Sequence, residues 1–406
     1  MRNFKFVVLL LFIFLFSCKN GKDDVTENIK PEEEPEIVIE EKGDATITVF
    51  ENSRIIFNAK KVPDGYNKPD KKGVIRLVNG RLILKQVELP KYERDVKIKL
   101  KVRLVSEGDP YDRSGSIFII PNSKKGVNAI DIAKDAKYPQ MEGELSKYPG
   151  IIRLKDYEPC VELMRFMTPF GVGFYSRQST PPHVDAWEED VKWECDISHL
   201  YPLMEESFYM GVWIDTWVKQ GFAIDVVLEA IESKENKKRE RYNVLPLMNT
   251  CPYIGQNYPD VFHHYQEGIK VASELKDKEI KKATLYYITT GHGGYGSDGD
   301  EFSKKENIIS LGTKTLHKWE PWIDSCVEYR KWNPSSGVFY EGVGGASSDL
   351  GRSNWCPGSK VEPLEIPLSP EDIKLDDNFS FTIKNANQSK DGKIDFWLVS
   401  SYIVWK

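Results

Sequence analysis

Three short stretches combine residue types that could carry out acid–base chemistry. Residues 109–113 read Asp-Pro-Tyr-Asp-Arg, residues 299–302 read Gly-Asp-Glu-Phe, and residues 351–358 read Gly-Arg-Ser-Asn-Trp-Cys-Pro-Gly. Each places carboxylates or an arginine beside aromatic residues in a predicted loop, and loops carried on a rigid sheet often hold the functional groups of a protein. The stretches lie far apart in the sequence, so folding would have to join them into one acidic cleft lined by aromatic side chains.

Asp112 is the first candidate for an acid or base, because it lies between Tyr111 and Arg113 just before a predicted strand. A nearby arginine lowers the pKa of an aspartate and an aromatic wall raises it, so such a site can be tuned in either direction. The alternative is a simple turn, since Asp109-Pro110 is a good turn opener.

Two other acidic positions are equally open to a functional or a structural interpretation. Asp300-Glu301 follows the glycine-rich residues 291–296, whose backbone could approach a ligand closely, but a solvated acidic loop would have the same sequence. Asp215 lies between Trp213 and Trp217 at period two, which predicts that all three share one strand face. That face could form a ligand groove, or it could hold a hydrogen-bonded structural aspartate.

Metal and nucleophile chemistry find little support in the sequence. The six histidines include no His-x-His or His-x-x-x-His pair, and no Cys-x-x-Cys is present. Gly-x-Ser-x-Gly is also absent. We therefore predict no metal and no cofactor, and the carboxylates remain as the candidates for catalysis.

The elements that must position these residues are strands. Period-two alternation and apolar runs predict strands over residues 45–50, 96–104, 116–120, 162–166, 209–217, 222–231, 284–289, 379–383 and 396–405. The nearest approach to an amphipathic helix is a weak pattern over residues 267–278. A charged linker over residues 233–241 divides the strands into two β domains, residues 45–232 and 242–406. The fold class is therefore all-β, built from sandwiches or barrels.

The N-terminus predicts export. Residues 1–17 form a signal peptide, in which Arg2 and Lys5 flank the start of an apolar run, residues 6–16, that is too short to span a bilayer. The run ends in Leu-Phe-Ser before Cys18, which resembles a bacterial lipoprotein cleavage box. Lipidated Cys18 would then anchor the chain to the outer membrane, with display on the cell surface as one outcome. The alternative is a plain secretory signal with an incidental cysteine.

The next segment, residues 18–44, is acidic and has few residues able to pack, so we predict a disordered tether. The whole chain has a formal net charge of -6 and shows no basic stripe with interleaved aromatics. This argues against nucleic acid as a partner. We expect a monomer.

Five cysteines follow the predicted lipidation site: Cys160, Cys195, Cys251, Cys326 and Cys356. Export favours disulfides, and an odd number leaves at least one thiol unpaired. Cys326 with Cys356 is the best-supported pair, because it would close a long loop rich in glycine and serine. Cys251 follows an apolar run and is predicted to be free, while the pairing of the others stays open.

The order and context of these stretches resemble the peptide-N-glycosidase F family, bacterial enzymes that remove whole N-glycans from glycoproteins. Tyr111-Asp112-Arg113 resembles the family's Trp-Asp-Arg. Residues 165–170, Arg-Phe-Met-Thr-Pro-Phe, resemble its Arg-Phe-Ile-Thr-Pro-Tyr. Residues 215–221, Asp-Thr-Trp-Val-Lys-Gln-Gly, resemble its Glu-Thr-Trp-Leu-Ala-Lys-Gly, so this chain has aspartate where the family's second acidic residue is glutamate.

The resemblance continues through the second half of the chain. Gly291-His292 matches a Gly-His pair in the family's cleft, and Asp300-Glu301-Phe302 falls where the family has Ala-Glu-Trp. Two cysteines that bracket the family's glutamate are absent here. Residues 352–358 resemble Arg-Ala-Gly-Trp-Cys-Pro-Gly, whose cysteine pairs in the family with one near Cys326. The resemblance covers nearly everything from about residue 45 to the end.

This resemblance implies two tandem jelly-roll-like antiparallel sandwiches, packed side by side with the active site between them. It implies a glycoamidase that hydrolyses the amide bond between the first GlcNAc and asparagine of an N-glycoprotein or glycopeptide. Asp112 would be the principal acid/base residue, Glu301 would help to activate water, and Asp215 would be the third acid. The residues expected to bind substrate are Arg113, Arg352, Tyr111, Trp217, His292, Phe302 and Trp355, with Arg113 and Arg352 also holding Asp112.

Two other functions fit the same residues. A non-catalytic N-glycan-binding lipoprotein could have this fold, because a fold does not determine a function. A glycoside hydrolase could use Asp112 and Glu301 as a carboxylate pair, and it would break a sugar–sugar bond while leaving asparagine glycosylated.

Overall fold

The computed structural model describes residues 38–62, 68–122, 126–171, 187–254, 256, 260–293, 299–334, 347–390 and 394–406. The predicted signal peptide, Cys18 and the tether up to residue 37 lie outside the described residues. Residues from Ile39 to Lys406 form one compact unit. Within the described ranges no helix is both long enough and apolar enough to cross a membrane.

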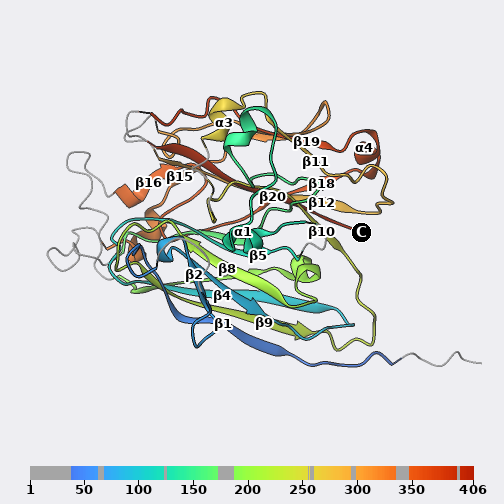
Figure 1. The fold of residues 1–406 in the computed structure, drawn as a ribbon, viewed down its shortest axis with the longest axis horizontal. Coiled ribbons are helices and arrows are strands. Elements are labelled where there is room, and N and C mark those ends of the chain that lie inside the picture. Colours follow the sequence, from blue (N-terminus) through green and yellow to red (C-terminus); the bar gives the residue numbers. More distant parts are fainter. Residues whose placement is uncertain are drawn as a thin grey trace, which may run out of the picture. The chain divides into compact units, whose positions relative to one another are not determined.

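The first half of the chain forms two antiparallel sheets, blue to green in Figure 1. One sheet has the order β1 (Ala45–Ile55), β9 (Phe222–Glu232), β4 (Val96–Ser106) and β7 (Asp190–Asp196). The other has the order β17 (Lys360–Val361), β6 (Val161–Met167), β5 (Ser114–Ile120), β8 (Phe208–Ile214), β3 (Leu82–Val87) and β2 (Ile75–Leu77). The strand β17 comes from the second half of the chain, so the sheets interlock across the predicted domain boundary.

The second half forms another pair of antiparallel sheets. One has the order β10 (Asn243–Asn249), β20 (Asp395–Trp405), β12 (Ala283–Gly293) and β18 (Leu364–Leu368). The other has the order β11 (Ile269–Ala272), β19 (Asn378–Ile383), β13 (Asn307–Leu311) and β14 (Lys314–Trp319), and β15 (Ile323–Ser325) pairs with β16 (Leu350–Arg352). The predicted all-β, two-sandwich architecture is confirmed.

Helices are short wherever the chain is described. The α-helices are α1 (Ala129–Ala133), α3 (Val261–His264) and α4 (Pro370–Leu375). The 3-10 helices are η1 (Val78–Gly80), η2 (Gly143–Lys147), η3 (Ser198–Leu203), η4 (Val327–Trp332) and η6 (Ser347–Asp349). The weak helical pattern over residues 267–278 was misleading, because this stretch contains β11, whose Ile269 and Val271 alternate into the core.

Packing on both faces explains why β5 ends in four consecutive apolar residues, 117–120. All seven of its residues are buried. Ile117 and Ile119 face the core of the first sandwich, whereas Phe118 and Ile120 join a second cluster with Phe396 and Leu398 of β20. An antiparallel strand with one wet face would alternate, so the continuous run marks the sheet that lies between the two cores.

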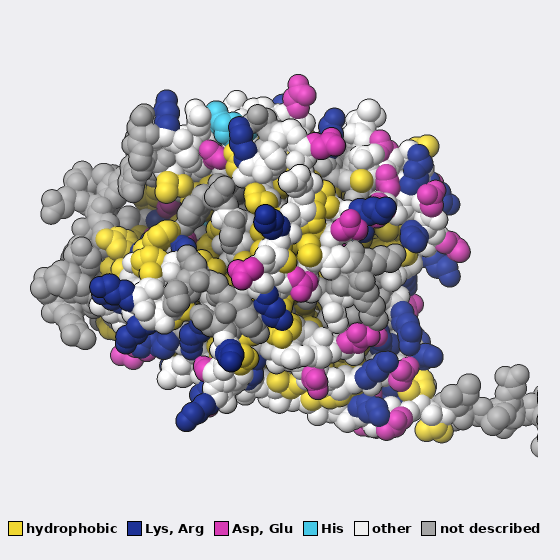
Figure 2. All heavy atoms as spheres, in the orientation of Figure 1, with side chains coloured by type: hydrophobic (Ala, Val, Ile, Leu, Met, Phe, Trp, Pro, Cys, Tyr) yellow, Lys and Arg dark blue, Asp and Glu magenta, His cyan; other side chains and the backbone are white. Residues whose placement is uncertain are grey.

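Residues at the end of the predicted tether contact the end of β9 and the start of the predicted linker. The Glu232 carboxylate accepts hydrogen bonds from the backbone amides of Lys42 and Gly43 at 2.7 and 2.6 Å. The amide of Ile39 donates to Asn236 Oδ1 at 2.8 Å. Elsewhere basic and acidic side chains are interspersed over the face of the molecule shown in Figure 2.

Candidate active site

The three chemical stretches of the sequence meet at one cavity of about 380 Å³. Strand pairing explains why. The start of β5 and the end of β8 lie at the same end of their sheet, since Gly115 pairs with Ile214. This arrangement brings Asp112 and Asp215 together. In the second sandwich His292 pairs with Phe396. The lining residues are Asp112, Arg113, Ser114, Asp215, Trp217, His292, Gly293, Glu301, Trp355, Ile394 and Phe396.

Arg352 joins the two principal carboxylates. Its Nε donates to Glu301 Oε1 at 3.0 Å, and its Nη2 donates to Asp112 Oδ2 at 3.4 Å. The Arg352 side chain is only 1% exposed. The ring centroids of Phe302 and Trp355 lie 5.0 and 4.9 Å from its guanidinium carbon. One buried cation therefore holds two acids that come from opposite halves of the chain.

Burial shifts both carboxylates toward the protonated form. The pKa of Glu301 is raised from 4.5 to about 7, because burial outweighs the opposing charge of Arg352 and the neighbouring Asp112 adds to the increase. Burial also raises the pKa of Asp112, against the opposing charges of Arg352 and Arg113. Glu301 can therefore gain or lose a proton near neutral pH, as an acid–base group should.

Arg113 does not hold Asp112 by a hydrogen bond, contrary to the prediction. Its Nε donates to Asp109 Oδ2 at 3.0 Å, and Thr216 Oγ1 donates to the same oxygen at 2.7 Å. Asp109 is fully buried, so it is a structural anchor for this loop and not merely the opening residue of a turn. Of the two arginines, Arg352 is the direct partner of Asp112.

Asp215 has an ion-pair partner that the sequence did not reveal. Arg81 Nη1 lies 3.1 Å from Asp215 Oδ1, and the Arg81 guanidinium lies 4.3 Å from the Trp217 ring centroid. Trp217 is 47% exposed at the cavity. The prediction that Trp213 shares this face was wrong, because β8 ends at Ile214 and Trp213 is buried in the core between the sandwiches.

Asp300 and Glu301 have separate roles despite being adjacent. Asp300 is fully buried and accepts a hydrogen bond from Trp397 Nε1 at 3.0 Å, so it anchors the loop. The Glu301 carbonyl accepts from the amide of Ser353 at 3.0 Å, which ties this loop to the segment that carries Arg352. These bonds hold the loop at the place where the peptide-N-glycosidase F family has the two cysteines that this chain lacks.

Close approach of the backbone requires the glycines at the end of β12. A Cβ at Gly291 would lie 2.6 Å from the Asp300 carbonyl oxygen, and one at Gly293, where φ is +84°, would lie 1.6 Å from that of Ile394. Both glycines therefore serve contacts within the protein. Residues 294–296 of the predicted glycine-rich loop lie outside the described residues.

Comparisons with known proteins agree with this arrangement. Residues 46–230 match the N-terminal domain model of peptide-N-glycosidase F, and residues 257–404 match its C-terminal domain model. The chain belongs to the peptide-N-glycosidase F family. A comparison with curated proteins found no match.

Two solved structures are similar to this chain. PNGF-II, in a C2 crystal form, is 34% identical with a TM-score of 0.76, and the match covers 89% of this chain. The chain spans 65% of the length of the PNGF-II structure. PNGase F, a glycosylasparaginase from Flavobacterium meningosepticum, is 15% identical with a TM-score of 0.52, and the match covers 90% of this chain and 96% of that one, which shows the shared fold.

The remaining positions carried over from the family resemblance take different places. His292 and Trp355 line the cavity with their rings 5.4 Å apart, and Trp355 Nε1 donates to the Gly291 carbonyl at 2.8 Å. Tyr111 lies over Arg113, and Phe302 lies over Arg352. Neither Tyr111 nor Phe302 is among the described lining residues.

Sequence reasoning missed Arg81 as well as the lining residues Ser114, Ile394 and Phe396. Ser114 directly follows Arg113, so its adjacency was the one available signal. Phe396 reaches the site because β12 and β20 are paired in register, which no local pattern in the sequence reveals.

The predicted disulfide between Cys326 and Cys356 is present, with Cα atoms 5.5 Å apart. It fixes the residue next to Trp355. Cys160, Cys195 and Cys251 are free thiols, which agrees with the prediction for Cys251 and answers the open question of the other two. The described residues contain no cluster of three or more histidine, cysteine or carboxylate groups suited to a metal ion.

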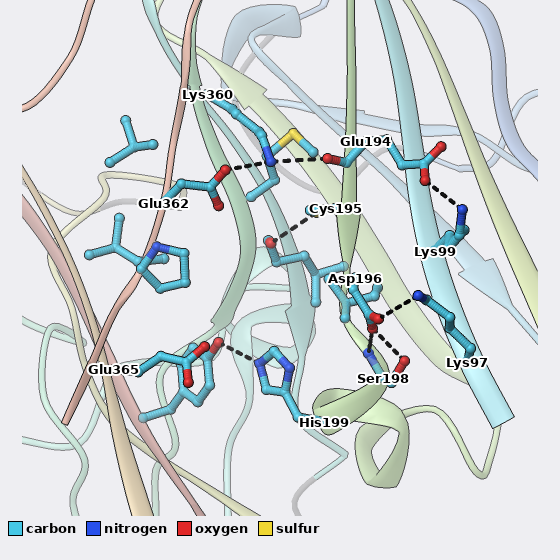
Figure 3. Close-up of a pocket in the computed structure, with 17 residues that line it drawn as sticks. Lys97, Lys99, Glu194, Cys195, Asp196, Ser198, His199, Lys360, Glu362 and Glu365 are labelled. Carbon is cyan, nitrogen blue, oxygen red and sulfur yellow. Dashed lines mark hydrogen bonds and ion pairs between the residues drawn. The ribbon is translucent and has the colours of Figure 1, made fainter. Parts of the chain in front are cut away.

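A larger cavity of about 780 Å³ lies where the edge strands β7, β17 and β18 meet. Figure 3 shows that most of its labelled charged side chains pair with one another. Lys99 Nζ lies 2.7 Å from Glu194 Oε1, and Lys360 Nζ lies 2.5 Å from Glu362 Oε1. His199 Nε2 lies 3.0 Å from the Tyr402 hydroxyl.

Proposed function

We propose that this protein is a glycoamidase that hydrolyses the amide bond between the first GlcNAc and asparagine of N-glycoproteins. The products are aspartate in the peptide and the intact glycan as a glycosylamine, which then loses ammonia. The observation that carries the proposal is the pairing of Asp112 and Glu301 on one buried arginine at the cavity where the two sandwiches meet. Membership of the peptide-N-glycosidase F family supports it.

The carboxylates supply the proton transfers. Amide hydrolysis needs an activated water molecule and a proton for the leaving nitrogen. A Glu301 pKa of about 7 suits it to take a proton from water at neutral pH. Asp112, as the principal acid/base residue, would contact the sugar–asparagine linkage and deliver a proton to the departing nitrogen.

Arg352 would position both acids and moderate their repulsion. Without a cation, two buried carboxylates in one site cannot both ionise readily. The guanidinium bonds to each carboxylate with a different nitrogen, so it can tolerate a change of charge on either one. Fixed charges of this kind are in place before the reaction and need no reorganisation during it.

Aromatic side chains would bind the sugar. The exposed face of Trp217 and the wall formed by Trp355 suit the apolar faces of sugar rings. Asp215 would accept a hydrogen bond from a sugar hydroxyl while Arg81 fixes its orientation. Arg113, whose guanidinium Asp109 holds, would bind polar substrate groups at the cavity.

We also propose that the protein is an exported lipoprotein. The signal-like residues 1–17 and the cysteine at position 18 support this proposal. Lipid on Cys18 would tether a monomeric enzyme to the outer membrane. Metabolic labelling with an alkyne fatty acid should mark the wild-type protein and not a Cys18→Ala variant, and equal labelling of both would contradict the anchor.

The activity is tested with a defined N-glycopeptide and the purified protein in H₂¹⁸O, followed by mass spectrometry. Release of the intact glycan, with asparagine converted to aspartate that carries one ¹⁸O, is the expected result. An unchanged glycopeptide that the protein retains would identify a binding protein. Shortened glycans on unchanged asparagine would identify a glycoside hydrolase.

A further inference from the structure

A buried arginine from the first sandwich reaches His292 in the second through one hydroxyl group. Arg165 lies on β6 and is fully buried, and both Thr290 and His292 lie on β12. Arg165 Nη1 is 3.2 Å from Thr290 Oγ1, and that oxygen is 2.7 Å from His292 Nε2. The chain of contacts therefore runs from the core between the sandwiches to a residue that lines the active-site cavity.

The donors of Arg165 are all committed. A guanidinium has five N–H groups and no acceptor. Nε and Nη2 donate to the two Glu162 oxygens at 3.0 and 2.6 Å, and Nη2 also donates to Cys251 Sγ at 3.3 Å. Nη1 donates to the Leu398 carbonyl and to Thr290 Oγ1. Thr290 Oγ1 must therefore accept from Arg165, because arginine can only donate.

The hydroxyl proton of Thr290 then has one acceptor. Thr290 is fully buried, and within the described chain Arg165 and His292 are the partners of its Oγ1. If His292 Nε2 carried a proton, the Thr290 proton would be buried without an acceptor, which is costly. The consistent arrangement has the Thr290 hydroxyl donating to an unprotonated Nε2.

The His292 ring is neutral in this setting. Burial and the positive charge of Arg165 both hold the pKa of His292 well below 6.5. A neutral imidazole with an unprotonated Nε2 carries its proton on Nδ1. Nδ1 has no hydrogen-bond partner in the described part of the chain. Because it is absent from the fully buried polar atoms that lack a partner, Nδ1 is not fully enclosed.

We propose that Arg165 and Thr290 are positioning residues that fix His292 as the Nδ1–H tautomer, which presents an N–H donor to a carbonyl oxygen of the substrate. The ring is held between Trp355 and Phe396, with centroids 5.4 and 5.1 Å away, so it cannot turn freely. This inference rests on the proposed function only for the identity of the acceptor.

A neutral donor suits this cavity. Glu301 is ionised when it acts as the base, and its negative charge would repel the oxygen of an amide group. A neutral N–H can bond to that oxygen without handing a proton to a neighbouring carboxylate, as an imidazolium could. Donors placed in advance in this way stabilise charge that develops on a carbonyl oxygen.

The tautomer is tested by two-bond ¹H–¹⁵N NMR of the ¹⁵N-histidine-labelled protein at neutral pH, with His292 assigned by comparison with His292→Gln. The expected spectrum shows an unprotonated Nε2 and a protonated Nδ1. A protonated Nε2, or an imidazolium, would overturn the proposal. This result needs no turnover, so it stands apart from the test of the glycoamidase activity.

The relay is tested with Thr290→Val, which keeps the branched shape and removes the hydroxyl, and with Thr290→Ser, which keeps the hydroxyl. Thr290→Val should shift the His292 signals toward the Nε2–H form and lower kcat about tenfold, while Thr290→Ser retains the wild-type spectrum. Unchanged His292 signals in Thr290→Val, with a loss of thermal stability alone, would overturn the role of Thr290.

The role of the donor is tested by binding. The Asp112→Asn protein is titrated with the N-glycopeptide while the Nδ1 proton of His292 is observed. A downfield shift on binding is expected for a hydrogen bond to substrate. Saturated binding with an unmoved Nδ1 proton would contradict the donor role whether or not the wild-type protein releases glycan.

Discussion

Two cavities share a wall in this protein and differ in how their charges are arranged. Ile288 and Val361 line the larger cavity and pack against Trp355, which lines the smaller one. In the larger cavity most of the charged rim residues form ion pairs near solvent, such as Lys99 with Glu194 and Lys360 with Glu362 (Figure 3). In the smaller cavity one buried arginine serves two carboxylates.

The pKa directions follow from this difference. The hydrogen bond from Lys99 lowers the pKa of Glu194 in the larger cavity, so this acid is held ionised. In the smaller cavity burial dominates and raises the pKa of Glu301 to about 7. The larger volume therefore does not mark the chemical site, whereas the environment of the carboxylates does.

The largest difference is expected when the cation of each cavity, Arg352 or Lys360, is replaced. Arg352→Met would leave two carboxylates, whose side chains are only 15% and 18% exposed, without a counter-charge, at a cost of about 3–5 kcal/mol in the free energy of unfolding, and would abolish glycan release. Lys360→Met removes an exposed pair of the larger cavity and should cost at most about 1 kcal/mol with activity unchanged. Urea denaturation measures the stability of both variants and the glycopeptide assay measures their activity. Equal losses in the two variants would contradict the predicted difference between the cavities.

The two glutamates come next. Glu301→Gln keeps the shape and removes the titrating group, so kcat should fall by about 10²–10⁴. Glu194→Gln is the matched change in the larger cavity and should leave kcat within error of the wild type. Steady-state kinetics on one glycopeptide compares the two variants. A strong effect of Glu194→Gln would show that the reaction depends on the larger cavity.

A smaller difference between the two cavities is expected in how kcat and the free energy of unfolding depend on pH. If Glu301 acts as a base, kcat should decline about tenfold per pH unit below about 7. Stability should behave in the opposite way. Between pH 4.5 and about 7 the folded state keeps a Glu301 proton that the unfolded state has lost, so the free energy of unfolding falls as pH rises through this window.

The Glu301→Gln variant provides the control for both measurements. It should lack this part of the stability change, whereas Glu194→Gln should retain it. A wild-type rate that is flat from pH 5 to 8 would show that a Glu301 proton does not control the reaction.

The smallest effect is expected at Cys195, which lines the larger cavity. Burial raises the pKa of its thiol to about 12, so little reactive thiolate forms at neutral pH. Iodoacetamide should leave native Cys195 unmodified by peptide mass spectrometry, and Cys195→Ser should release glycan at the wild-type rate. Rapid labelling with loss of activity would tie the larger cavity to the reaction.

Local patterns predicted the longest strands, because period two is visible over the eleven residues of strands such as β4 and β9, but they missed the seven-residue strands β7 and β10. They could not reveal β2 or β17, which have three and two residues. The family motifs led to Asp112, Glu301 and Arg352, which the fold brings together.

Partners of side chains were harder to predict, because they depend on three-dimensional packing. Arg113 is adjacent to Asp112 in sequence, yet it bonds to the buried Asp109. Arg81 is 134 residues from Asp215 and carries no motif. The tryptophan pairing around Asp215 failed because the strand ends one residue before it.

Whether Asp112 carries out the hydrolysis is tested most directly by comparing Asp112→Asn with the wild-type protein on one N-glycopeptide by mass spectrometry. We expect intact glycan and aspartate from the wild type, and no product from a variant that is folded and still binds the glycopeptide. Glycan release by Asp112→Asn at the wild-type rate would contradict the assignment of this cavity as the active site.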